Sequence, residues 1–397
     1  MLVLMNEQAH NRNFDDTADK PRCAFLFGKS TGSESIDFLR GGEMTHASMG
    51  CFLIGVTGPG FSANGDALIG SVSDDPYDVR TFLRAVKPAG SQAHIGTELV
   101  STTEHSLIER GYFSDPGETT RGLNESGLAF TCALIFEKET AERTPDATSF
   151  ADLSRKMMTN CETVLDAIDL FRSGGACTPP FSVLLADAKG DLAHLEAGAF
   201  GVNVNHHYSQ QNPGVVFAVN CYLSQKLVHY NAPNAVIENT QNNNLARRER
   251  GEQLAQELRG KLDVASLARI LSDHANRERD PMDNPLLEAW GYSICNHGTR
   301  HQETYPHENL PWGTVSAEII QPSEKLFWYA YGWACGQQPE YGDQIYQEKS
   351  WGKFVPFGFG ASDSENEEIT VLATADGEIT PAGLRSQAAR EPATRVG

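Results

Sequence analysis

The chain has 397 residues, of which 40% are hydrophobic, and a formal net charge of −20 at pH 7. This length can bury one large or two ordinary hydrophobic cores. The negative balance argues against nucleic acid as a partner, and no apolar run reaches the length of a membrane span, so we expect no membrane partner either. The short basic run Arg247-Arg248-Glu249-Arg250 has the pattern of a solvated helix face.

Residues 1–49 are predicted to form a leader or propeptide. The first 22 residues are polar and non-periodic, and they lack the long apolar stretch of a signal peptide. Residues Arg40 to Met44 could be encoded by a purine-rich stretch that resembles a ribosome-binding site followed by an ATG codon. Translation that starts at Met44 or Met49 is therefore an alternative. The eight cysteines form no C-x-x-C pair, which favours a reduced, cytoplasmic setting.

Cys51 begins the first predicted hairpin. An apolar strand runs from Cys51 to Val56, a turn contains Asn64-Gly65, and a second strand from Ala67 ends at Asp74. Because the strands of a hairpin are antiparallel, we expect the cysteine at the start of one and the acid at the end of the other to lie close together.

The remaining elements alternate between strand clusters and helix pairs, which predicts layered sheets with helices packed outside. In chain order we expect a buried strand at 128–136, a helix at about 150–173, a hairpin of 181–186 with 192–196, a strand at 215–220, helices at 244–260 and 264–276 with Asp263 as the N-cap of the second, and a hairpin of 315–320 with 326–331. Residues 361–397 are acidic and small, which predicts a mobile tail.

The pair Gly50–Cys51 suits a nucleophile that is freed by cutting the chain. If Cys51 becomes the first residue, its own α-amine, with an unperturbed pKa of roughly 8, lies beside the sulfur. That amine can accept the thiol proton and later donate it to a leaving amine. Gly50 has no side chain to hinder the strained geometry of an N-to-S acyl shift, and Asp74 can hold the new ammonium. The alternative is an ordinary buried cysteine.

Several motifs occur in a fixed order along the chain. They are Gly50-Cys51, Asp74, Gly122-x-Asn124-Glu125-x-Gly127-Leu128, Asn220, Ser293-Ile294-Cys295 and Thr314-Val315-Ser316. In this order the chain resembles the acyl-coenzyme A:6-aminopenicillanic acid acyltransferase family of cysteine N-terminal-nucleophile (Ntn) hydrolases, which is distantly related to penicillin V acylase and bile salt hydrolase. The resemblance implies an α+β fold over about 50–360, a four-layer αββα sandwich of two antiparallel sheets.

The resemblance also implies roles for single residues. Cys51 would be the nucleophile after self-cleavage at Gly50–Cys51, with Asp74 beside it. Asn220 would donate a side-chain N–H to the oxyanion hole, together with a backbone N–H near the end of the 128–136 strand. The chain departs from the pattern at Ser71 and Asn296, where relatives carry arginines, so we expect the positive charge to come from Arg80 or His297.

The predicted protein is a zymogen that matures by autocatalytic cleavage and acts on a small-molecule linear amide. A hydrolase or acyltransferase of this kind forms an acyl-thioester on Cys51 and requires no metal or organic cofactor. His206-His207 lacks a third ligand at metal-binding spacing. A homo-oligomer that retains the leader fragment is left open. Two alternatives remain: a conventional amidase that pairs Cys51 with His297, and a non-catalytic relative that serves as a binding or assembly module.

Overall fold

The computed structural model describes residues 51–76, 79–101, 119–138, 144, 147–232, 235–273, 293–296, 312–336, 352–359, 370–374 and 377–388. All of them belong to the unit Ile36–Gly397, and the other unit, Met1–Ser35, falls outside this part of the chain. The predicted leader, the bond at Gly50 and His297 also lie outside the described residues, so the predictions made for them stay predictions.

Six strands form the first antiparallel sheet. Their order is β12 (Gly214–Ala218), β1 (Phe52–Thr57), β2 (Leu68–Pro76), β13 (Trp312–Gln321), β14 (Leu326–Tyr331) and β15 (Val355–Gly358). The predicted hairpin is confirmed as the pair β1–β2, and Gly65 in its turn has φ +83°, a left-handed conformation that favours glycine. The predicted late hairpin is the pair β13–β14.

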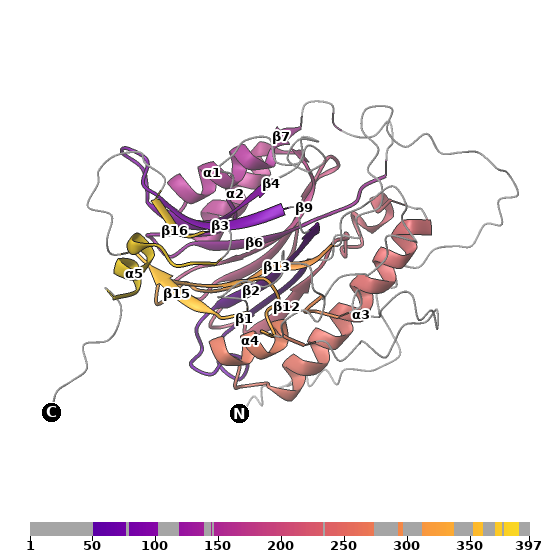
Figure 1. The fold of residues 1–397 in the computed structure, drawn as a ribbon. Helices are drawn as coiled ribbons and strands as arrows, with labels where there is room; N and C mark the ends of the chain where they lie inside the picture. The colour runs from indigo at the N-terminus through magenta and orange to yellow at the C-terminus, as the bar shows by residue number, and fades with distance from the viewer. Residues whose placement is uncertain are drawn as a thin grey trace, which may run out of the picture. The chain divides into compact units, whose positions relative to one another are not determined.

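Eight strands form the second antiparallel sheet. Their order is β11 (Gly201–Tyr208), β10 (Leu192–Gly198), β9 (Phe181–Ala186), β6 (Ala129–Leu134), β5 (Thr119–Asn124), β4 (His94–Ser101), β3 (Val79–Val86) and β16 (Thr370–Ala373). Two further short strands, β7 (Thr148–Ser149) and β8 (Cys177–Thr178), pair with each other in parallel. The two large sheets face one another, because β1 and β2 contact β6 and β9 (Figure 1).

Helices cover the outer face of each sheet (Figure 1). On the eight-stranded sheet lie α1 (Phe150–Asn160) and α2 (Val164–Gly174), and on the six-stranded sheet lie α3 (Ala235–Glu257) and α4 (Val264–Leu271). The single helix predicted at 150–173 is in fact two, because Thr163 and Asp166 form a capping box that starts α2. Asp263 caps α4 as predicted. These layers confirm the four-layer αββα sandwich.

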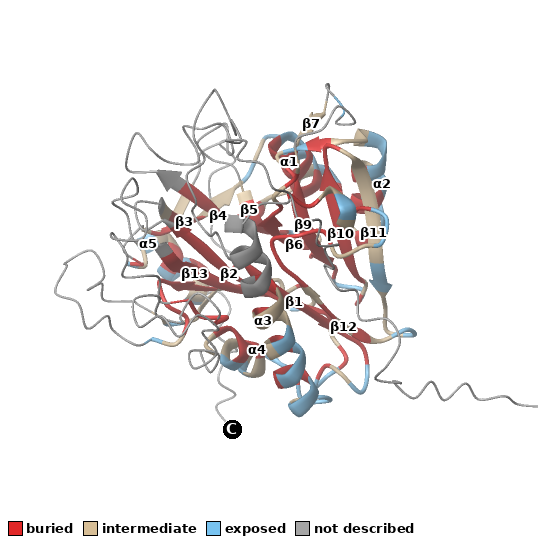
Figure 2. Ribbon diagram, turned by 90° about the vertical axis from the view of Figure 1, so that its right-hand side faces the viewer, coloured by how far each residue is buried: buried red, intermediate tan, exposed pale blue. Residues whose placement is uncertain are grey.

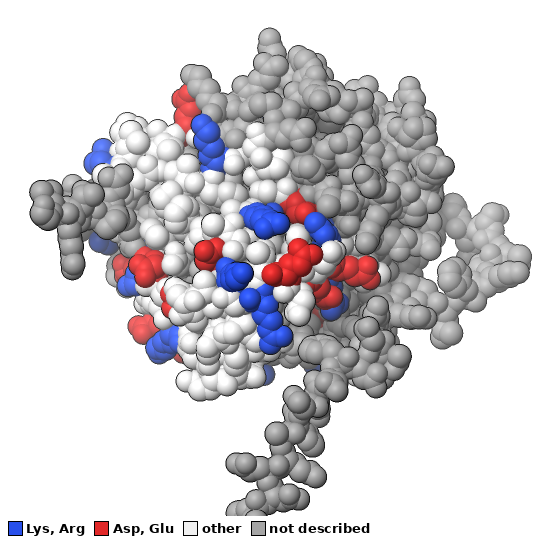
Figure 3. Space-filling model, turned by 90° about the horizontal axis from the view of Figure 1, so that it is seen from below, with Lys and Arg blue, Asp and Glu red and all other residues white. Residues whose placement is uncertain are grey.

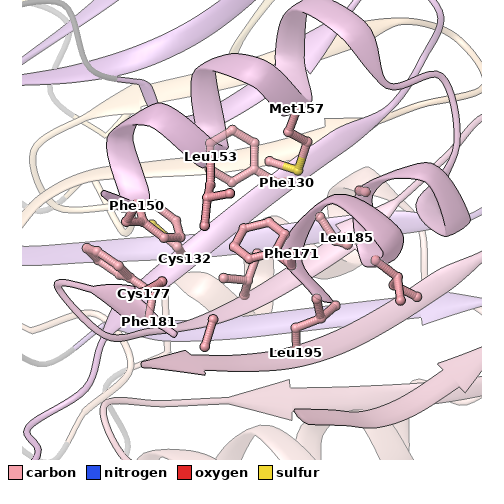
Figure 4. Packing of buried hydrophobic residues seen from close by; sticks show 14 of the residues in the cluster. Phe130, Cys132, Phe150, Leu153, Met157, Phe171, Cys177, Phe181, Leu185 and Leu195 are labelled. Atoms are coloured by element: carbon pink, nitrogen blue, oxygen red, sulfur yellow. The ribbon is translucent and has the colours of Figure 1, made fainter. Parts of the chain in front are cut away.

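A large apolar core lies between α1, α2 and the eight-stranded sheet (Figure 4). Phe150 and Phe181 pack with ring centroids 4.1 Å apart, and Met157, Phe171 and Leu195 complete the contact between the layers. Burying each such side chain stabilises the fold by roughly 1.5–3 kcal/mol. Figure 2 shows that burial continues along the strands of both sheets.

Helix α3 approaches the six-stranded sheet closely at one glycine. A Cβ on Gly251 would lie 2.5 Å from the Phe52 ring of β1, so a larger residue would push the helix away. Arg247 lies four residues earlier on the same helix face and is fully buried. The sequence-based interpretation of Arg247 as part of a solvated face is therefore wrong. The face that carries Arg247 and Gly251 packs against the sheet, and the missing side chain of Gly251 permits this close approach.

The range predicted as a mobile acidic tail, 361–397, contains two ordered elements. Strand β16 pairs with β3 through the apolar run Val371-Leu372-Ala373, and α5 (Pro381–Ala388) packs on β15 and β16. This run is too short to stand out against the surrounding acidic composition. In the described part of the chain, no helix is both long enough and apolar enough to cross a membrane.

Candidate active site

Cys51 lies at the head of β1, at one end of the space between the sheets. Leu53 is opposite Ala218 on β12 and Ser71 on β2. Extending both registers by two residues places Cys51 between Asn220 and Ser73. Because alternate residues share a face, Cys51 and Ser73 lie on the face that carries Leu53 and Ser71, and Asn220 lies just beyond the end of β12.

An arginine from the opposite sheet reaches the sulfur. Arg121 on β5 donates from Nη2 to Cys51 Sγ over 3.7 Å, and both residues are buried. Burial raises the pKa of the Cys51 thiol, Arg121 opposes this rise, and the carboxyls of Asp75 and Asp74 add to it. A hydrogen bond from the Asp74 backbone also favours the thiolate.

Glu318 on β13 binds the same arginine. Its Oε2 lies 3.5 Å from Arg121 Nε. Its carboxylate accepts hydrogen bonds from Ser316 at 2.6 Å, Ser71 at 3.0 Å and Thr97 at 3.3 Å. Ser71, where the resemblance implies an arginine, thus hydrogen-bonds the counterion of an arginine supplied by the other sheet.

Asp74 faces the helix side of the six-stranded sheet and is fully buried. Its carboxylate accepts hydrogen bonds from Thr314 Oγ1 at 2.7 Å and Asn296 Nδ2 at 3.4 Å, and Arg247 Nη1 lies 3.9 Å away. Burial raises the pKa of Asp74 to about 7, although Arg247, Thr314 and Asn296 each act to lower it. The carboxyl therefore titrates near neutral pH.

Arg247 links this carboxyl to Asn220. Its Nη2 donates to Asn244 Oδ1 at 2.7 Å and to Asn220 Oδ1 at 3.5 Å. The Asn220 amide nitrogen donates to the Leu134 carbonyl at 2.8 Å, and an amide nitrogen carries two N–H groups. These contacts fix the orientation of the amide predicted to serve the oxyanion hole.

The backbone N–H expected as second donor is not identified by the structure. Of the N–H groups at the end of the predicted 128–136 strand, that of Ile135 donates to the Pro180 carbonyl at 2.9 Å. The second oxyanion donor therefore stays a prediction.

The structure brings Cys51, Asp74 and Asn220 to one end of the sandwich but places different cations beside them. Arg80, expected as the source of charge, donates to Tyr331 Oη at 2.7 Å. Arg121 and Arg247 instead contact the candidate residues.

The sequence held a signal for Arg247, since Asn244, Arg247 and Gly251 recur at the spacing of one helix face. For Arg121 the only local signal is its position directly before the Gly122 motif.

Metal-ligating side chains do not gather at this site. In the described part of the chain, no group of three or more His, Cys, Asp or Glu side chains is arranged to hold an ion. The groups that the site offers for chemistry are a thiol, carboxyls, amides and guanidinium groups.

Two facing antiparallel sheets between helix layers, with a cysteine at the head of an inner strand, define the Ntn-hydrolase fold. A family model described as acyl-coenzyme A:6-aminopenicillanic acid acyl-transferase matches residues 76–305, more than half of the chain. The chain belongs to this family. The matched segment includes Arg121, Asn220 and Arg247. It begins at residue 76, so neither Cys51 nor Asp74 lies within it.

Three solved structures that are similar to this chain share little sequence with it. A mutant of the conjugated bile acid hydrolase from Clostridium perfringens has 11% identity and a TM-score of 0.44, covering 80% of this chain and 96% of its own. Penicillin V acylase from Agrobacterium tumefaciens has 16% identity and a TM-score of 0.40, covering 78% and 92%. The Caenorhabditis elegans ortholog of N-acylethanolamine-hydrolyzing acid amidase has 14% identity and a TM-score of 0.38, covering 69% and 93%. No curated protein matches the sequence.

Proposed function

We propose that the protein is a cysteine Ntn enzyme that hydrolyses a small-molecule linear amide or transfers its acyl group to an acceptor. The observation that carries the proposal is the arrangement around Cys51, where Arg121 Nη2 lies 3.7 Å from the sulfur and the Asp74 backbone hydrogen-bonds it. Membership of an acyltransferase family supports the same reaction class.

In the proposed reaction, self-cleavage at Gly50–Cys51 frees the α-amine of Cys51. The amine accepts the thiol proton, and the thiolate attacks the amide carbonyl. Asn220, oriented by Arg247 and Leu134, donates to the oxyanion of the tetrahedral intermediate. The leaving amine takes the proton back, and water or a second amine then displaces the acyl group from the sulfur.

Asp74 has a separate task in this scheme. Its carboxylate, near Cys51 and held by Thr314 and Asn296, can accept a hydrogen bond from the new α-ammonium. The positive charge of that ammonium would also lower the Asp74 pKa from about 7, so that the carboxyl ionises after cleavage.

The alternative of a non-catalytic module rests on Ser71 and Asn296, which stand where the related enzymes carry arginines. Both side chains take part in the site, Ser71 by donating to Glu318 and Asn296 by donating to Asp74. Their place in the site supports the proposed enzyme over the module, which Cys51→Ala would distinguish. A cytoplasmic location, a retained leader and a homo-oligomer stay predictions.

Intact-mass and N-terminal analysis of the purified full chain tests the proposal. We expect the wild type to begin at Cys51, and Cys51→Ala to remain uncut and to lose at least ~10³-fold of its activity toward a panel of N-acyl amides. The matched control is Cys177→Ala, which removes a buried thiol of the α1–α2 core and should leave cleavage intact. Full activity in an uncut wild type would reject the Ntn mechanism, and activity that survives Cys51→Ala would reject the thiol.

A further inference from the structure

The charge network between the sheets suggests a role that reaches beyond the three predicted site residues. We propose that Arg121 is a further catalytic residue, whose guanidinium stabilises the Cys51 thiolate, and that Glu318 sets how much of its charge the sulfur experiences. This inference rests on the proposed function, since it assumes that Cys51 is the nucleophile.

The first support is that one rigid group contacts both partners. Arg121 Nη2 lies 3.7 Å from Cys51 Sγ, and Nε of the same guanidinium lies 3.5 Å from Glu318 Oε2. The guanidinium is planar and always charged, so a contact at one nitrogen fixes the direction of the others. The arginine thereby bridges β1 of one sheet to β5 of the other at the sulfur.

The second support is burial. The side chains of Arg121 and Glu318 are 3% and 0% exposed, so solvent and salt screen this charge poorly. The nucleophile of a cysteine enzyme is the thiolate, which burial disfavours. A cation in direct contact with the sulfur offsets that effect.

Glu318 is held in place so that it competes with the sulfur for the arginine. Burial raises the pKa of Glu318, and Arg121 opposes this rise. Three hydroxyls, those of Ser316, Ser71 and Thr97, donate to the carboxylate and also favour the ionised form. An ionised Glu318 neutralises part of the Arg121 charge. Removing Glu318 should therefore strengthen the effect of Arg121 on Cys51, whereas removing Arg121 should abolish it.

Other titratable groups surround the pair, and the test must leave them unchanged. Asp75, Asp74 and Arg247 also act on Cys51. Asp75 and Cys132 act on Arg121 as well. Burial raises the pKa of Cys132 to about 12, so this thiol carries no charge in the neutral range.

The experiment measures how fast iodoacetamide alkylates Cys51 between pH 6 and 10, read by peptide mass spectrometry on the full chain. The thiolate displaces iodide and forms a C–S bond, so the rate follows the thiolate fraction without any amide substrate. Intact mass first separates cut from uncut chains, and equal forms are compared. Cys335, a partly exposed thiol, serves as the internal control.

We expect Arg121→Met to move the pH midpoint upward and to slow alkylation at pH 7 about tenfold or more, since one pKa unit changes the thiolate fraction tenfold. Arg121→Lys should restore part of the rate. Glu318→Gln should move the midpoint downward. Opposite shifts of the pH midpoint in the two variants distinguish the proposed charge effect from a loss of folding. Misfolding would shift the midpoint of both variants in the same direction and would also change the alkylation rate of Cys335.

An unchanged Cys51 profile in folded Arg121→Met would overturn the proposal, as would Glu318→Gln and Arg121→Met shifting the same way. If Arg121→Met alone does not fold, the double variant with Glu318→Gln removes both buried charges and is compared with Glu318→Gln. The Cys51 midpoint should be higher in the double variant, and an equal midpoint would overturn the proposal. Failure of the proposed function looks different: amide activity would then survive complete alkylation of Cys51, whatever the effect of Arg121 on the rate.

Discussion

Two buried arginines flank the same strand end, and their surroundings differ. Between the sheets, burial acts to lower the pKa of Arg121, but Glu318 and then Cys51 raise it above its ordinary value. On the helix side, burial lowers the pKa of Arg247 more than Asp74 raises it. Glu318 accepts three hydroxyl hydrogen bonds and lies 3.5 Å from its arginine, whereas Asp74 lies 3.9 Å from Arg247.

This difference separates two tasks. In the Arg121–Glu318 pair, the guanidinium of Arg121 places a positive charge beside the sulfur. The Arg247–Asp74 pair contains a carboxyl whose pKa is about 7, so the net charge of the pair changes with pH around neutrality. Substitutions on the helix side should therefore show strong pH dependence in stability. Those between the sheets should act chiefly on the reactivity of Cys51.

The largest expected effect is that of Arg247→Met. At pH 8, in the uncut Cys51→Ala background, the variant leaves the Asp74 carboxyl buried without its cation. The carboxyl must then stay unpaired or take up a proton, which should lower the free energy of unfolding by about 3–5 kcal/mol. At pH 5 the loss should be smaller, because Asp74 is protonated below its pKa of about 7. Urea unfolding at both pH values measures the difference.

The neighbouring residue offers a matched control. Arg248 pairs with Glu252 over 2.8 Å on α3, and both side chains are partly exposed. Figure 3 shows acidic and basic side chains interspersed on the face of the molecule seen from below. Arg248→Met should cost only about 0.2–1 kcal/mol at pH 8, far less than Arg247→Met. A pH-independent loss in Arg247→Met would contradict the coupling to Asp74.

Asp74→Asn should have the next largest effect on the free energy of unfolding. Unlike Arg247→Met, this variant should gain stability relative to its parent as the pH rises. Since burial raises the Asp74 pKa from 3.8 to about 7, the native state binds this proton more tightly than the unfolded chain does. The resulting stabilisation is complete below about pH 4 and is lost as the pH rises to about 7. The asparagine does not titrate, so its stability relative to aspartate should increase by up to about 4 kcal/mol between pH 4 and 8.

This measurement is made in the Cys51→Ala background, where no α-ammonium forms beside the carboxyl. The reference is Cys51→Ala with Asp74 intact. A stability difference that stays flat across the pH range would show that the native and unfolded pKa values of Asp74 are alike.

Thr314→Val should have an intermediate effect. It removes the hydroxyl that donates to Asp74 at 2.7 Å and accepts from the Asn296 backbone at 2.9 Å. A hydrogen bond to a charged group contributes about 1.5–3 kcal/mol, so the Asp74 pKa should rise by about one unit or more. The acid limb of the kcat/KM profile toward an amide should move to higher pH by the same amount. Thr314→Ser keeps the hydroxyl and should behave like the wild type; an acid limb unmoved in Thr314→Val would exclude Asp74 as its source.

Much of the fold could be predicted because it depends on local patterns. Apolar runs and the Asn64-Gly65 turn identified the hairpin of β1 and β2, and Asp263 identified the start of α4. The sequence pattern predicts no strand between 79 and 101, where β3 and β4 lie. These strands carry charged residues such as Arg84 and Glu98, which form an ion pair across the two strands. Such strands lack the continuous apolar run that marks β6.

The site could be predicted only in part, for a physical reason. Cys51, Asp74 and Asn220 stand at strand ends beside recognisable turns and motifs. Arg121, Arg247 and Glu318 are ordinary charges in the sequence, and their burial depends on which strands and helices meet them. A charge can be buried at acceptable cost only where a partner of opposite charge meets it. Arg121 and Glu318 lie 197 residues apart, so no local sequence period relates them.

The smallest expected effects form a graded series around Glu318 that sharpens the contrast between the two arginines. Ser316 and Thr97 donate to the same oxygen, Oε1, at 2.6 Å and 3.3 Å. Ser316→Ala should cost about 1–3 kcal/mol of stability, and Thr97→Val about 1 kcal/mol or less, because its hydrogen bond is longer. Each loss makes the ionised carboxylate less favourable, so less of the Arg121 charge is neutralised.

The alkylation midpoint of Cys51 should therefore move downward in the order Glu318→Gln, Ser316→Ala, Thr97→Val, with the last barely detectable. Thr314→Val is the matched control, since it removes a hydroxyl of similar burial from the helix-side carboxyl instead. It should raise the Asp74 pKa and leave the Arg121–Glu318 contact intact. If Thr314→Val and Ser316→Ala changed Cys51 reactivity equally, the sulfur would be responding to the summed charge of the strand end, and the distinction between the two arginines would fail.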